Sequence, residues 1–278
     1  MLVKVGVLVG CLYYIYAQSG NKNFSALSSV INWEGFFGVA FLVSIMMLIN
    51  WYLEAVKWRI CLLPITPISK KDSIKGVLSG LTLNCILPFT MGDFVGRVLG
   101  LPKNKRILQA LLLNRISSLG ITILFGLVGV AYLYETRWTF LLLFCLFLFL
   151  VPLVAKSGNK IFRVYSHKEL LNLYLYSIIR YLVFSIQFFV LLKFFLYDFP
   201  WETLLMGIPV IFLIKTVAPS LLGAFGIREA AALWVFQPSG DQVTYLLAAC
   251  LMLWLLNIIV PSLLGLVPLF TYQSRFRI

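Results

Sequence analysis

The chain has 278 residues, of which 61% are hydrophobic and only 12% are charged, and its formal net charge is +13. A soluble domain is roughly half apolar and a quarter charged, so this composition excludes an ordinary soluble protein and predicts an all-α, polytopic membrane protein. The basic residues lie in short loops beside apolar runs. That is the positive-inside pattern of membrane proteins, and it does not indicate nucleic-acid binding.

The chain contains eight apolar segments. We expect about six of them to span the membrane and two to form re-entrant hairpins, which enter and leave the membrane on one side. In chain order the segments are Leu2–Ala17, Phe36–Val56, Gly76–Met91, Ile107–Tyr134, Trp138–Ala155, Tyr174–Tyr197, Leu204–Phe236 and Val243–Tyr272.

The third segment, Gly76–Met91, is too short and too interrupted for an ordinary span. Its 16 residues barely cross a bilayer even as a straight helix, and Asn84 and Pro88 interrupt it. Basic residues flank both ends, so both ends are expected in the cytoplasm. These residues are Lys57, Arg59, Lys70, Lys71 and Lys75 before the segment and Arg97, Lys103, Lys105 and Arg106 after it. The sequence therefore predicts a hairpin that enters from the cytoplasm.

The seventh segment, Leu204–Phe236, is too long and too broken for one helix. It contains Pro209, Pro219, Gly223, Gly226 and Arg228. We predict a second re-entrant hairpin here, entered from outside. The last segment then returns inward and leaves the basic tail in the cytoplasm, so that both chain termini are expected on the cytoplasmic side.

These elements predict an inverted repeat within a single transmembrane domain that covers residues 1–278. A span, a hairpin and a span over 36–134 recur over 174–272 in the opposite orientation. The decapeptides PFTMGDFVGR (88–97) and PSLLGAFGIR (219–228) share Pro, Gly, Phe and Arg at matching positions. Inverted repeats with interrupted helices in corresponding places are typical of transporters. The residues expected to form the hairpins are Asn84, Pro88, Gly92, Pro219, Gly223 and Gly226.

Charged residues beside the two hairpins are the candidates for a functional site. A charge inside a membrane costs roughly 2.5–3.5 kcal/mol and usually faces an interior cavity. Open helix ends and the planar donors of arginine suit a phosphate or a carboxylate. A structural ion pair that closes each hairpin is the equal alternative, and Arg97 is also explained as a topogenic loop charge. The candidates are Asp93, Arg97, Arg115, Lys215, Arg228 and Glu229.

Other charges near the ends of apolar segments are interpreted as snorkelling side chains, whose charged ends reach the membrane surface. They are Glu54, Lys57, Arg59, Arg180 and Lys193. The one histidine, His167, lies among residues expected to form a loop, and the five cysteines lack CxxC spacing. We therefore predict no metal site, no catalytic residue and no cofactor, and no nucleotide-binding loop is visible.

Three stretches carry a resemblance to a known family. They are NCILPFTMGDFVGR (84–97), ALLLNRISSLGI (110–121) and APSLLGAFGIREAAAL (218–233). With them the chain resembles the lysylphosphatidylglycerol synthase transmembrane family, also called flippase-like proteins, over nearly its whole length. In the first stretch the arginine comes one residue later than in the family, with Gly96 as the inserted residue. Arg97 therefore departs from the family pattern, whereas Asp93 and Glu229 follow it.

The resemblance implies a membrane-embedded lipid-handling domain. In the best-known members this domain passes an aminoacylated phospholipid between leaflets, and a separate C-terminal domain makes that lipid. The chain ends at Ile278, soon after the last segment, so we expect the stand-alone form without the synthase domain.

The expected function is translocation of an amphiphilic lipid across the bacterial cytoplasmic membrane, without enzymatic activity. The expected partners are anionic or aminoacylated phospholipids or polyprenyl-phosphate glycolipids. Whether the chain forms a homo-oligomer is an alternative that the sequence leaves open. Arg97, Arg115 and Arg228 are expected to neutralise the lipid phosphate. Asp93 and Glu229 would pair with these arginines in the empty site, or engage a cationic headgroup or a proton. Alternatives are a non-transporting partner of a lipid or glycan biosynthesis complex, and a lipid-head transferase.

Overall fold

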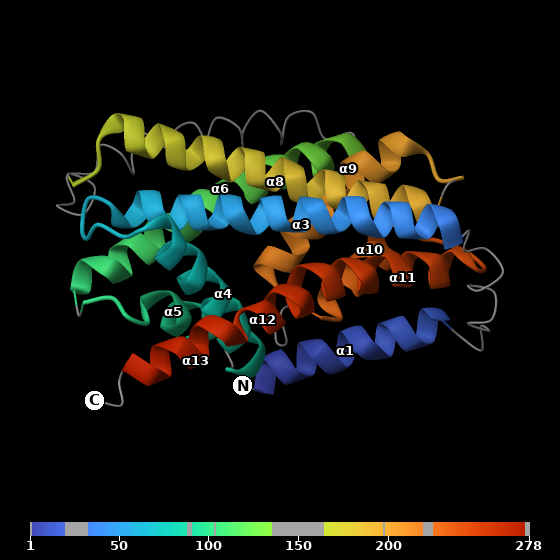
Figure 1. Ribbon diagram of the computed structural model, residues 1–278. Coiled ribbons are helices and arrows are strands. Elements are labelled where there is room, and N and C mark those ends of the chain that lie inside the picture. Colours follow the sequence, from blue (N-terminus) through green and yellow to red (C-terminus); the bar gives the residue numbers. More distant parts are fainter. Residues whose placement is uncertain are drawn as a thin grey trace. The chain divides into compact units, whose positions relative to one another are not determined.

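The computed structural model describes residues 2–19, 33–87, 91–102, 104–134, 164–196, 198–218 and 225–275. Every regular element among them is helical, which confirms the all-α expectation (Figure 1). The elements are α1 (Leu2–Ser19), α3 (Trp33–Leu62), α4 (Lys70–Ile86), α5 (Met91–Val98), α6 (Lys105–Leu133), α8 (His167–Phe195), α9 (Trp201–Val217), α10 (Ile227–Phe236), α11 (Gln242–Trp254), the π-helical turn η3 (Leu255–Ile259), α12 (Val260–Leu264) and α13 (Leu266–Arg275).

Four helical stretches of the described chain are long and apolar enough to cross a membrane. They are Gly35–Leu62 in α3, Lys105–Leu133 (α6), His167–Phe195 (α8) and Gln242–Thr271, which runs from α11 into α13. These are four of the six spans expected from the sequence. Of the other two, α1 contains only a shorter apolar helix, Gly6–Gln18, and Trp138–Ala155 lies outside the described residues.

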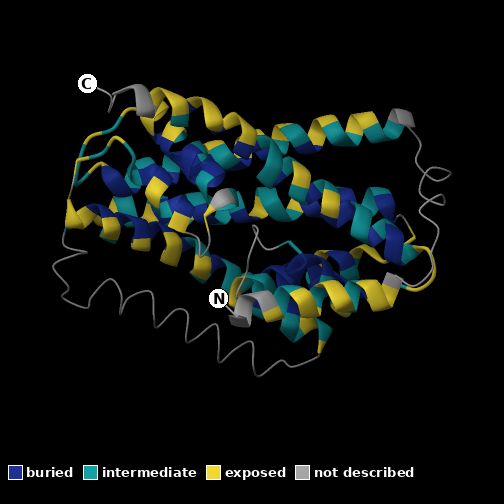
Figure 2. Ribbon diagram, turned by 90° about the horizontal axis from the view of Figure 1, so that it is seen from below, coloured by how far each residue is buried: buried dark blue, intermediate teal, exposed yellow. Residues whose placement is uncertain are grey.

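The outward faces of the helices are apolar, as a lipid environment requires. On α3 the side chains of Phe37, Phe41, Leu48 and Tyr52 are 66%, 70%, 57% and 48% exposed. Their spacing of four or seven residues sets them on one face of the helix. Figure 2 shows exposed positions recurring along individual helices, interspersed with intermediate and buried ones. The arrangement is that of a multi-pass membrane protein, in which lipid covers apolar faces that water would not.

Several helices extend past the apolar segments that define them in the sequence. α3 continues through Lys57 and Arg59 to Leu62. α4 begins at Lys70, where the Ser69 side chain accepts a hydrogen bond from the Asp72 backbone, and it continues through Asn84. The expectation that Asn84 interrupts the segment is therefore wrong. Capping groups and backbone hydrogen bonds set where a helix starts and ends, and hydropathy alone does not.

Two further boundary expectations are corrected by the structure. His167 is the first residue of α8, so the histidine does not lie in a loop. α9 continues past Pro209, so this proline does not break the segment as expected. Its position in the third turn is tolerated because neighbouring groups in a membrane protein can satisfy the backbone carbonyl that a helical proline leaves without a donor.

Helices α4 and α5 form a tightly packed helical hairpin in which α5 returns beside α4 (Figure 1). Two glycines on α5 permit this approach. A Cβ atom on Gly92 would lie 2.1 Å from the backbone carbon of Leu83, and one on Gly96 would lie 2.3 Å from the backbone nitrogen of Gly80. Small residues spaced by four are the usual means of bringing membrane helices into backbone contact. Pro88, expected at the tip, lies outside the described residues.

Helices α9 and α10 pack against each other in a second hairpin. Gly207 on α9 leaves room for the ring of Phe236 on α10, which would lie 2.3 Å from an added Cβ atom. Gly226 caps α10 with a backbone φ of 85°, a conformation that glycine adopts without strain. Pro219 and Gly223, the other residues expected to form this hairpin, lie outside the described residues.

The described residues group into two compact units. One comprises those of Met1–Leu48, Phe125–Thr136 and Val183–Ile259, and the other those of Ile49–Leu124, Arg137–Leu182 and Val260–Ile278. Element lengths recur along the chain. α3, α4, α5 and α6 have 30, 17, 8 and 29 residues, and α8, α9 and α10 have 29, 17 and 10 before the 30-residue stretch Gln242–Thr271. This is the order that the repeat predicts, and the inverted orientation stays a prediction.

Replacing Gly96 with leucine is expected to separate α5 from α4. The added side chain has no space beside the Gly80 backbone, and overpacking of this kind costs about 1–3 kcal/mol. We expect a lower midpoint of thermal unfolding for the purified protein in detergent. Gly38→Leu on α3 is the control, because nothing lies within 4 Å of a Cβ atom at that position. Equal midpoints for Gly96→Leu and the wild type would contradict the close packing.

Candidate functional site

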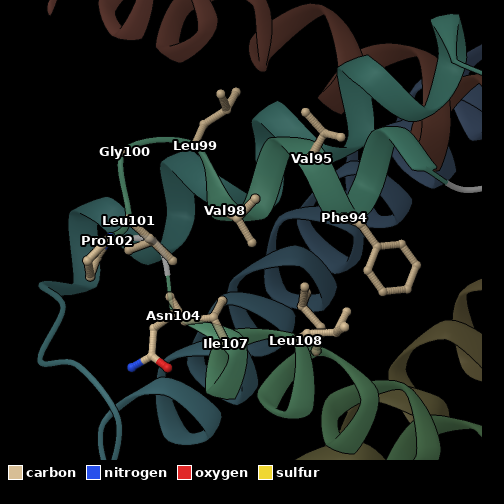
Figure 3. A pocket seen from close by; sticks show the side chains of 11 residues that line it. Phe94, Val95, Val98, Leu99, Gly100, Leu101, Pro102, Asn104, Ile107 and Leu108 are labelled. Carbon is tan, nitrogen blue, oxygen red and sulfur yellow. The ribbon is translucent and has the colours of Figure 1, made fainter.

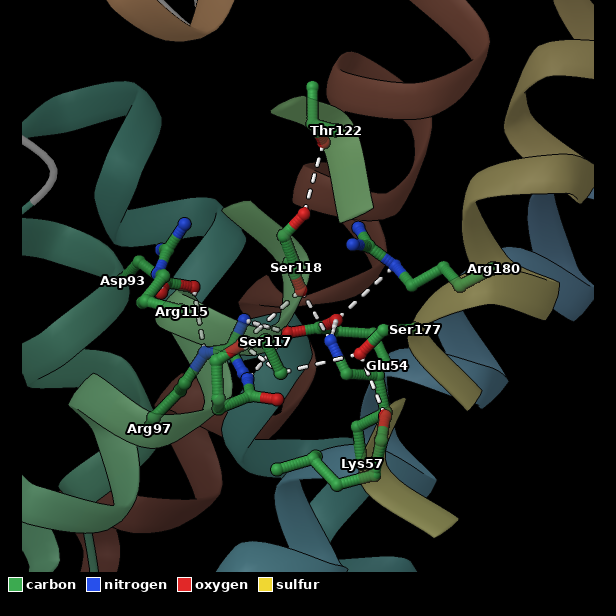
Figure 4. A network of polar contacts seen from close by, with 12 residues as sticks. Glu54, Lys57, Asp93, Arg97, Arg115, Ser117, Ser118, Thr122, Ser177 and Arg180 are labelled. Atoms are coloured by element: carbon green, nitrogen blue, oxygen red, sulfur yellow. Dashed lines mark hydrogen bonds and ion pairs between the residues drawn. The ribbon is translucent and has the colours of Figure 1, made fainter. Parts of the chain in front are cut away.

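A network of polar side chains, most of them buried, forms within the second compact unit, where α3, α5, α6 and α8 each contribute residues (Figure 4). We call it the charge network. It consists of Glu54 and Lys57 from α3, Asp93 and Arg97 from α5, Asn114, Arg115, Ser117 and Ser118 from α6, and Ser177 and Arg180 from α8.

The carboxylate of Glu54 is the centre of the charge network, and its side chain is only 5% exposed. Its Oε1 accepts hydrogen bonds from Arg97 Nη2 at 2.8 Å and from Asn114 Nδ2 at 2.9 Å. Its Oε2 lies 3.2 Å from Arg180 Nε, an ion pair without hydrogen-bond geometry, and 3.8 Å from Lys57 Nζ. One buried carboxylate therefore faces three cations.

Asp93 is the second carboxylate of the network and is also 5% exposed. Its Oδ1 accepts a hydrogen bond from Arg97 Nε at 2.9 Å, one turn further along α5, and its Oδ2 accepts one from Arg115 Nη2. Arg97 consequently bridges Asp93 and Glu54. On α3, Lys57 is completely buried and also donates a hydrogen bond to Ser118 Oγ.

The charges of the network do not balance. Four basic side chains (Lys57, Arg97, Arg115 and Arg180) face two carboxylates, which leaves a net charge of +2. A buried charge without full compensation is costly in a low-dielectric interior and attracts a counter-ion. One donor is also unused, because Arg97 Nη1 is buried and has no hydrogen-bond partner. The network is therefore suited to receive an anion.

Only part of the network is accessible. The side chain of Arg115 is 46% exposed and that of Arg180 is 25% exposed, whereas Arg97 is 3% exposed. On the outward face of α6, Arg115 lies among exposed apolar residues, including Leu112 and Leu119 at 48% and 42%. An anion that approaches along this face would therefore meet Arg115 before any other cation of the network.

An aromatic ring lies beneath each of the three guanidinium groups of the network. Their central carbons lie 5.8 Å from the ring centroid of Trp58 for Arg97, 5.9 Å from Phe94 for Arg115 and 5.5 Å from Trp51 for Arg180. Such cation–π contacts hold the guanidinium plane, while its N–H groups at the edge stay available for hydrogen bonds.

The sequence predicted three members of this network and misread three others. Asp93, Arg97 and Arg115 were candidates and lie together. Glu54, Lys57 and Arg180 were interpreted as snorkelling side chains, which is wrong because they join the buried network. A signal for two of them exists in the sequence, since Asn50, Glu54 and Lys57 recur at helical spacing and form one buried polar stripe on an apolar helix.

The remaining candidates lie in the first compact unit. Glu229 Oε1 accepts a hydrogen bond from Arg228 Nη2 at 2.5 Å, and its Oε2 accepts one from the Gly226 backbone at 2.8 Å. Arg228 also donates to the Cys250 carbonyl on α11 at 2.6 Å. These contacts are those of an ion pair that fixes the start of α10. On α9, Lys215 lies 5.7 Å from the ring centroid of Phe184.

The arginines that the two decapeptides align do not occupy equivalent places. Arg97 lies in the last turn of α5, whereas Arg228 lies in the first turn of α10. Among all the described residues, no group of three His, Cys, Asp or Glu side chains could hold a metal ion. Cys61 and Cys250 are buried free thiols, and Cys11 and Cys85 are partly buried ones.

A comparison with protein families matches the chain to a known family. The family model described as the lysylphosphatidylglycerol synthase TM region matches residues 1–164, which is more than half of the chain and includes α3 to α6 with their part of the charge network. No curated protein matches the chain. The matched region of lysylphosphatidylglycerol synthase is its transmembrane, non-catalytic part.

Replacing Glu54 with glutamine is expected to destabilise the protein strongly. The side chain keeps its size but loses the charge that three buried or partly buried cations share, and loss of one partner of a buried ion pair costs about 3–5 kcal/mol. Thermal unfolding in detergent measures the effect. Asp241→Asn, at an exposed position on the start of α11, is the matched control.

A second variant separates charge balance from local packing. Adding Arg180→Gln to Glu54→Gln removes one of the uncompensated cations, so the double variant should lose less stability than the two single variants together. Full stability of Glu54→Gln would show that its carboxylate does not hold the network.

Proposed function

The chain belongs to the lysylphosphatidylglycerol synthase TM family, and from this premise we propose that it moves an anionic lipid between the leaflets of the bacterial cytoplasmic membrane. The family makes it a multi-pass membrane protein of a lipid-related process. The observation that carries the finer proposal is the charge network, with its net charge of +2 and its accessible Arg115. We propose transport without covalent chemistry on the lipid.

The charge network acts as the place where the lipid phosphate is neutralised on its way through the membrane. A phosphate that leaves the headgroup region loses its hydration, and charge-assisted hydrogen bonds from arginine replace it. Arg115 meets the phosphate first because it is the most exposed cation of the network. Arg97 then offers its unused Nη1. Asp93 and Glu54 hold the arginines in position while no phosphate is present.

We further propose that the α4–α5 hairpin enters the membrane from the cytoplasm and returns to it. Its two helices pack closely, and basic residues stand at both ends, with Lys70 and Lys71 starting α4 and Lys105 and Arg106 starting α6. With eight residues, α5 is about 12 Å long and cannot span a bilayer. Both chain termini are cytoplasmic in this arrangement.

The α9–α10 hairpin takes the corresponding role from the outer side, as the second half of an inverted repeat. It carries the Arg228–Glu229 ion pair on α10 and Lys215 on α9, and buried Arg228 Nε has no hydrogen-bond partner, which leaves a donor for a phosphate. The lipids whose chemistry fits are anionic or aminoacylated phospholipids and polyprenyl-phosphate glycolipids. An aminoacylated headgroup would add a cation for Asp93 or Glu229.

Cysteine labelling tests the first hairpin. In a variant without the native cysteines, Lys71→Cys and Arg106→Cys are both exposed and stand at the two ends of the hairpin. A membrane-impermeant maleimide added to intact spheroplasts should label neither, and both should react once the membrane is permeabilised. Labelling of one position from outside and the other only from inside would mean that the segment spans.

Transport is tested with the purified chain in liposomes that contain fluorescent phosphatidylglycerol, by bleaching with an impermeant reductant. The wild type should expose inner-leaflet lipid to the reductant, and Arg97→Gln and Arg115→Gln should each slow this by about 10-fold or more, since a charged hydrogen bond contributes roughly 1.5–3 kcal/mol. Arg106→Gln, at an exposed position of α6, should transport normally.

The other outcomes have distinct meanings. A folded wild-type protein that exposes no inner-leaflet lipid would contradict transport and favour the non-transporting partner of a biosynthetic complex. Full transport by Arg228→Ala would remove the second hairpin's polar group from the pathway, while the first could still act.

A further inference from the structure

An open apolar groove runs between α5 and the start of α6, within the second compact unit (Figure 3). Its volume is about 470 Å³, within the range of roughly 300–1,000 Å³ that is common for ligand pockets. Phe94, Val95 and Val98 line it from α5, and Ile107, Leu108 and Leu111 line it from α6. Among the described residues that line it, Asn104 has the one polar side chain, and the others are apolar residues and Gly100.

Helix α5 separates this groove from the charge network. On one face, Asp93 and Arg97 are buried and point into the network. The residues between and beside them, Phe94, Val95 and Val98, line the groove. The short helix α5 thus has a cationic site on one side and an apolar groove on the other. An anionic amphiphile has the matching two parts, a charged headgroup and an apolar chain.

Arg115 connects the two sides. Leu108, Leu111 and Arg115 follow one another at i, i+3 and i+7 on α6, so Arg115 lies on the same face as the groove, one turn past its last lining residue. Its guanidinium carbon lies 5.9 Å from the ring centroid of Phe94, which lines the groove. The groove therefore ends at an exposed cation.

We propose that this groove holds an acyl chain of an anionic lipid whose phosphate is bound by Arg115. The inference rests on the proposed function, and it identifies the place where the lipid is bound before it moves between the leaflets. Only Nη2 of Arg115 bonds Asp93, so the planar group has further donors for a phosphate, and the lipid can bind before the Asp93 contact breaks.

Other occupants fit the groove less well. A neutral lipid brings no anion to the donors of Arg115 that Asp93 does not bond, and a free phosphate leaves the apolar lining uncovered. The opposite orientation places the headgroup at exposed Lys105 and Arg106, beside Asn104 at the far end of the groove. In that case the acyl chain would end against the Arg115 guanidinium, where it would cover donors without bonding them.

Photocrosslinking tests the groove directly. The full chain is reconstituted in nanodiscs with phosphatidylglycerol that carries a diazirine on one acyl chain, and crosslinked peptides are mapped by mass spectrometry. We expect crosslinks in residues 94–111 of the wild type. Phosphatidylcholine with the same probe should give about tenfold less, because its headgroup carries no net charge to match the guanidinium.

Two matched tryptophan variants control for general lipid contact. Leu108 lines the groove and is 56% exposed, so Leu108→Trp fills the groove and should abolish most crosslinks in residues 94–111. Leu112 lies on the same helix, is 48% exposed and does not line the groove. Leu112→Trp should leave the crosslinks unchanged. Arg115→Gln should reduce them about tenfold, and because this side chain is partly exposed, the helix should keep its fold.

The proposal is overturned by equal crosslinking from both phospholipids, by retention in Leu108→Trp, or by retention in Arg115→Gln with loss in a Lys105→Gln/Arg106→Gln variant. The liposome assay separates this result from the function. Translocation without groove crosslinks would refute the groove alone, and specific crosslinks without translocation would refute transport alone.

Discussion

The burial of the Glu54 carboxylate among three cations is the interaction on which this part of the molecule depends. A carboxylate taken out of water on an otherwise apolar helix loses several kcal/mol of hydration, and only close cations with good geometry return it. Those cations come from three helices, since Arg97 lies on α5, Arg180 on α8 and Lys57 on α3 itself. Asn114 ties α6 to the same oxygen as Arg97. The requirement to satisfy one charge thus fixes four helices that have few polar groups elsewhere.

The network can form only because glycine brings two backbones together. A Cβ atom at Gly80 would lie 3.0 Å from both the backbone and the side chain of Asp93 and 3.3 Å from Arg97 Cγ. Gly92 and Gly96 remove the corresponding obstacles on α5. Larger residues at these positions would move Asp93 and Arg97 away from Glu54. The glycines therefore allow the ion pairs to form, because they allow α4 and α5 to pack closely.

The sequence predicted the helical fold and half of the charged residues of the network, and the other half was missed for physical reasons. Asp93 and Arg97 stood out because they follow helix breakers in an apolar region. Glu54 and Lys57 looked like snorkelling residues because they approach the end of an apolar run, and linear position does not tell which face of a helix meets a neighbour. The role of Arg180 could be recognised only from its contact with Glu54, because no acidic residue lies close enough to it in the sequence to pair with it. Tertiary contacts between distant segments supplied what local patterns lack.

The two carboxylates also bear on whether a phosphate could leave again. Four cations without carboxylates would bind a dehydrated phosphate too tightly for turnover, as a conducting site must bind its ion favourably but release it. With Asp93 and Glu54 present, a phosphate competes for guanidinium donors that are already bonded, so its arrival exchanges one set of charge-assisted hydrogen bonds for another. The free energy of the exchange is then smaller than that of either set alone. In the transport that we propose, the residual charge of +2 would favour the bound anion, and the two carboxylates would compete with it and so allow its release.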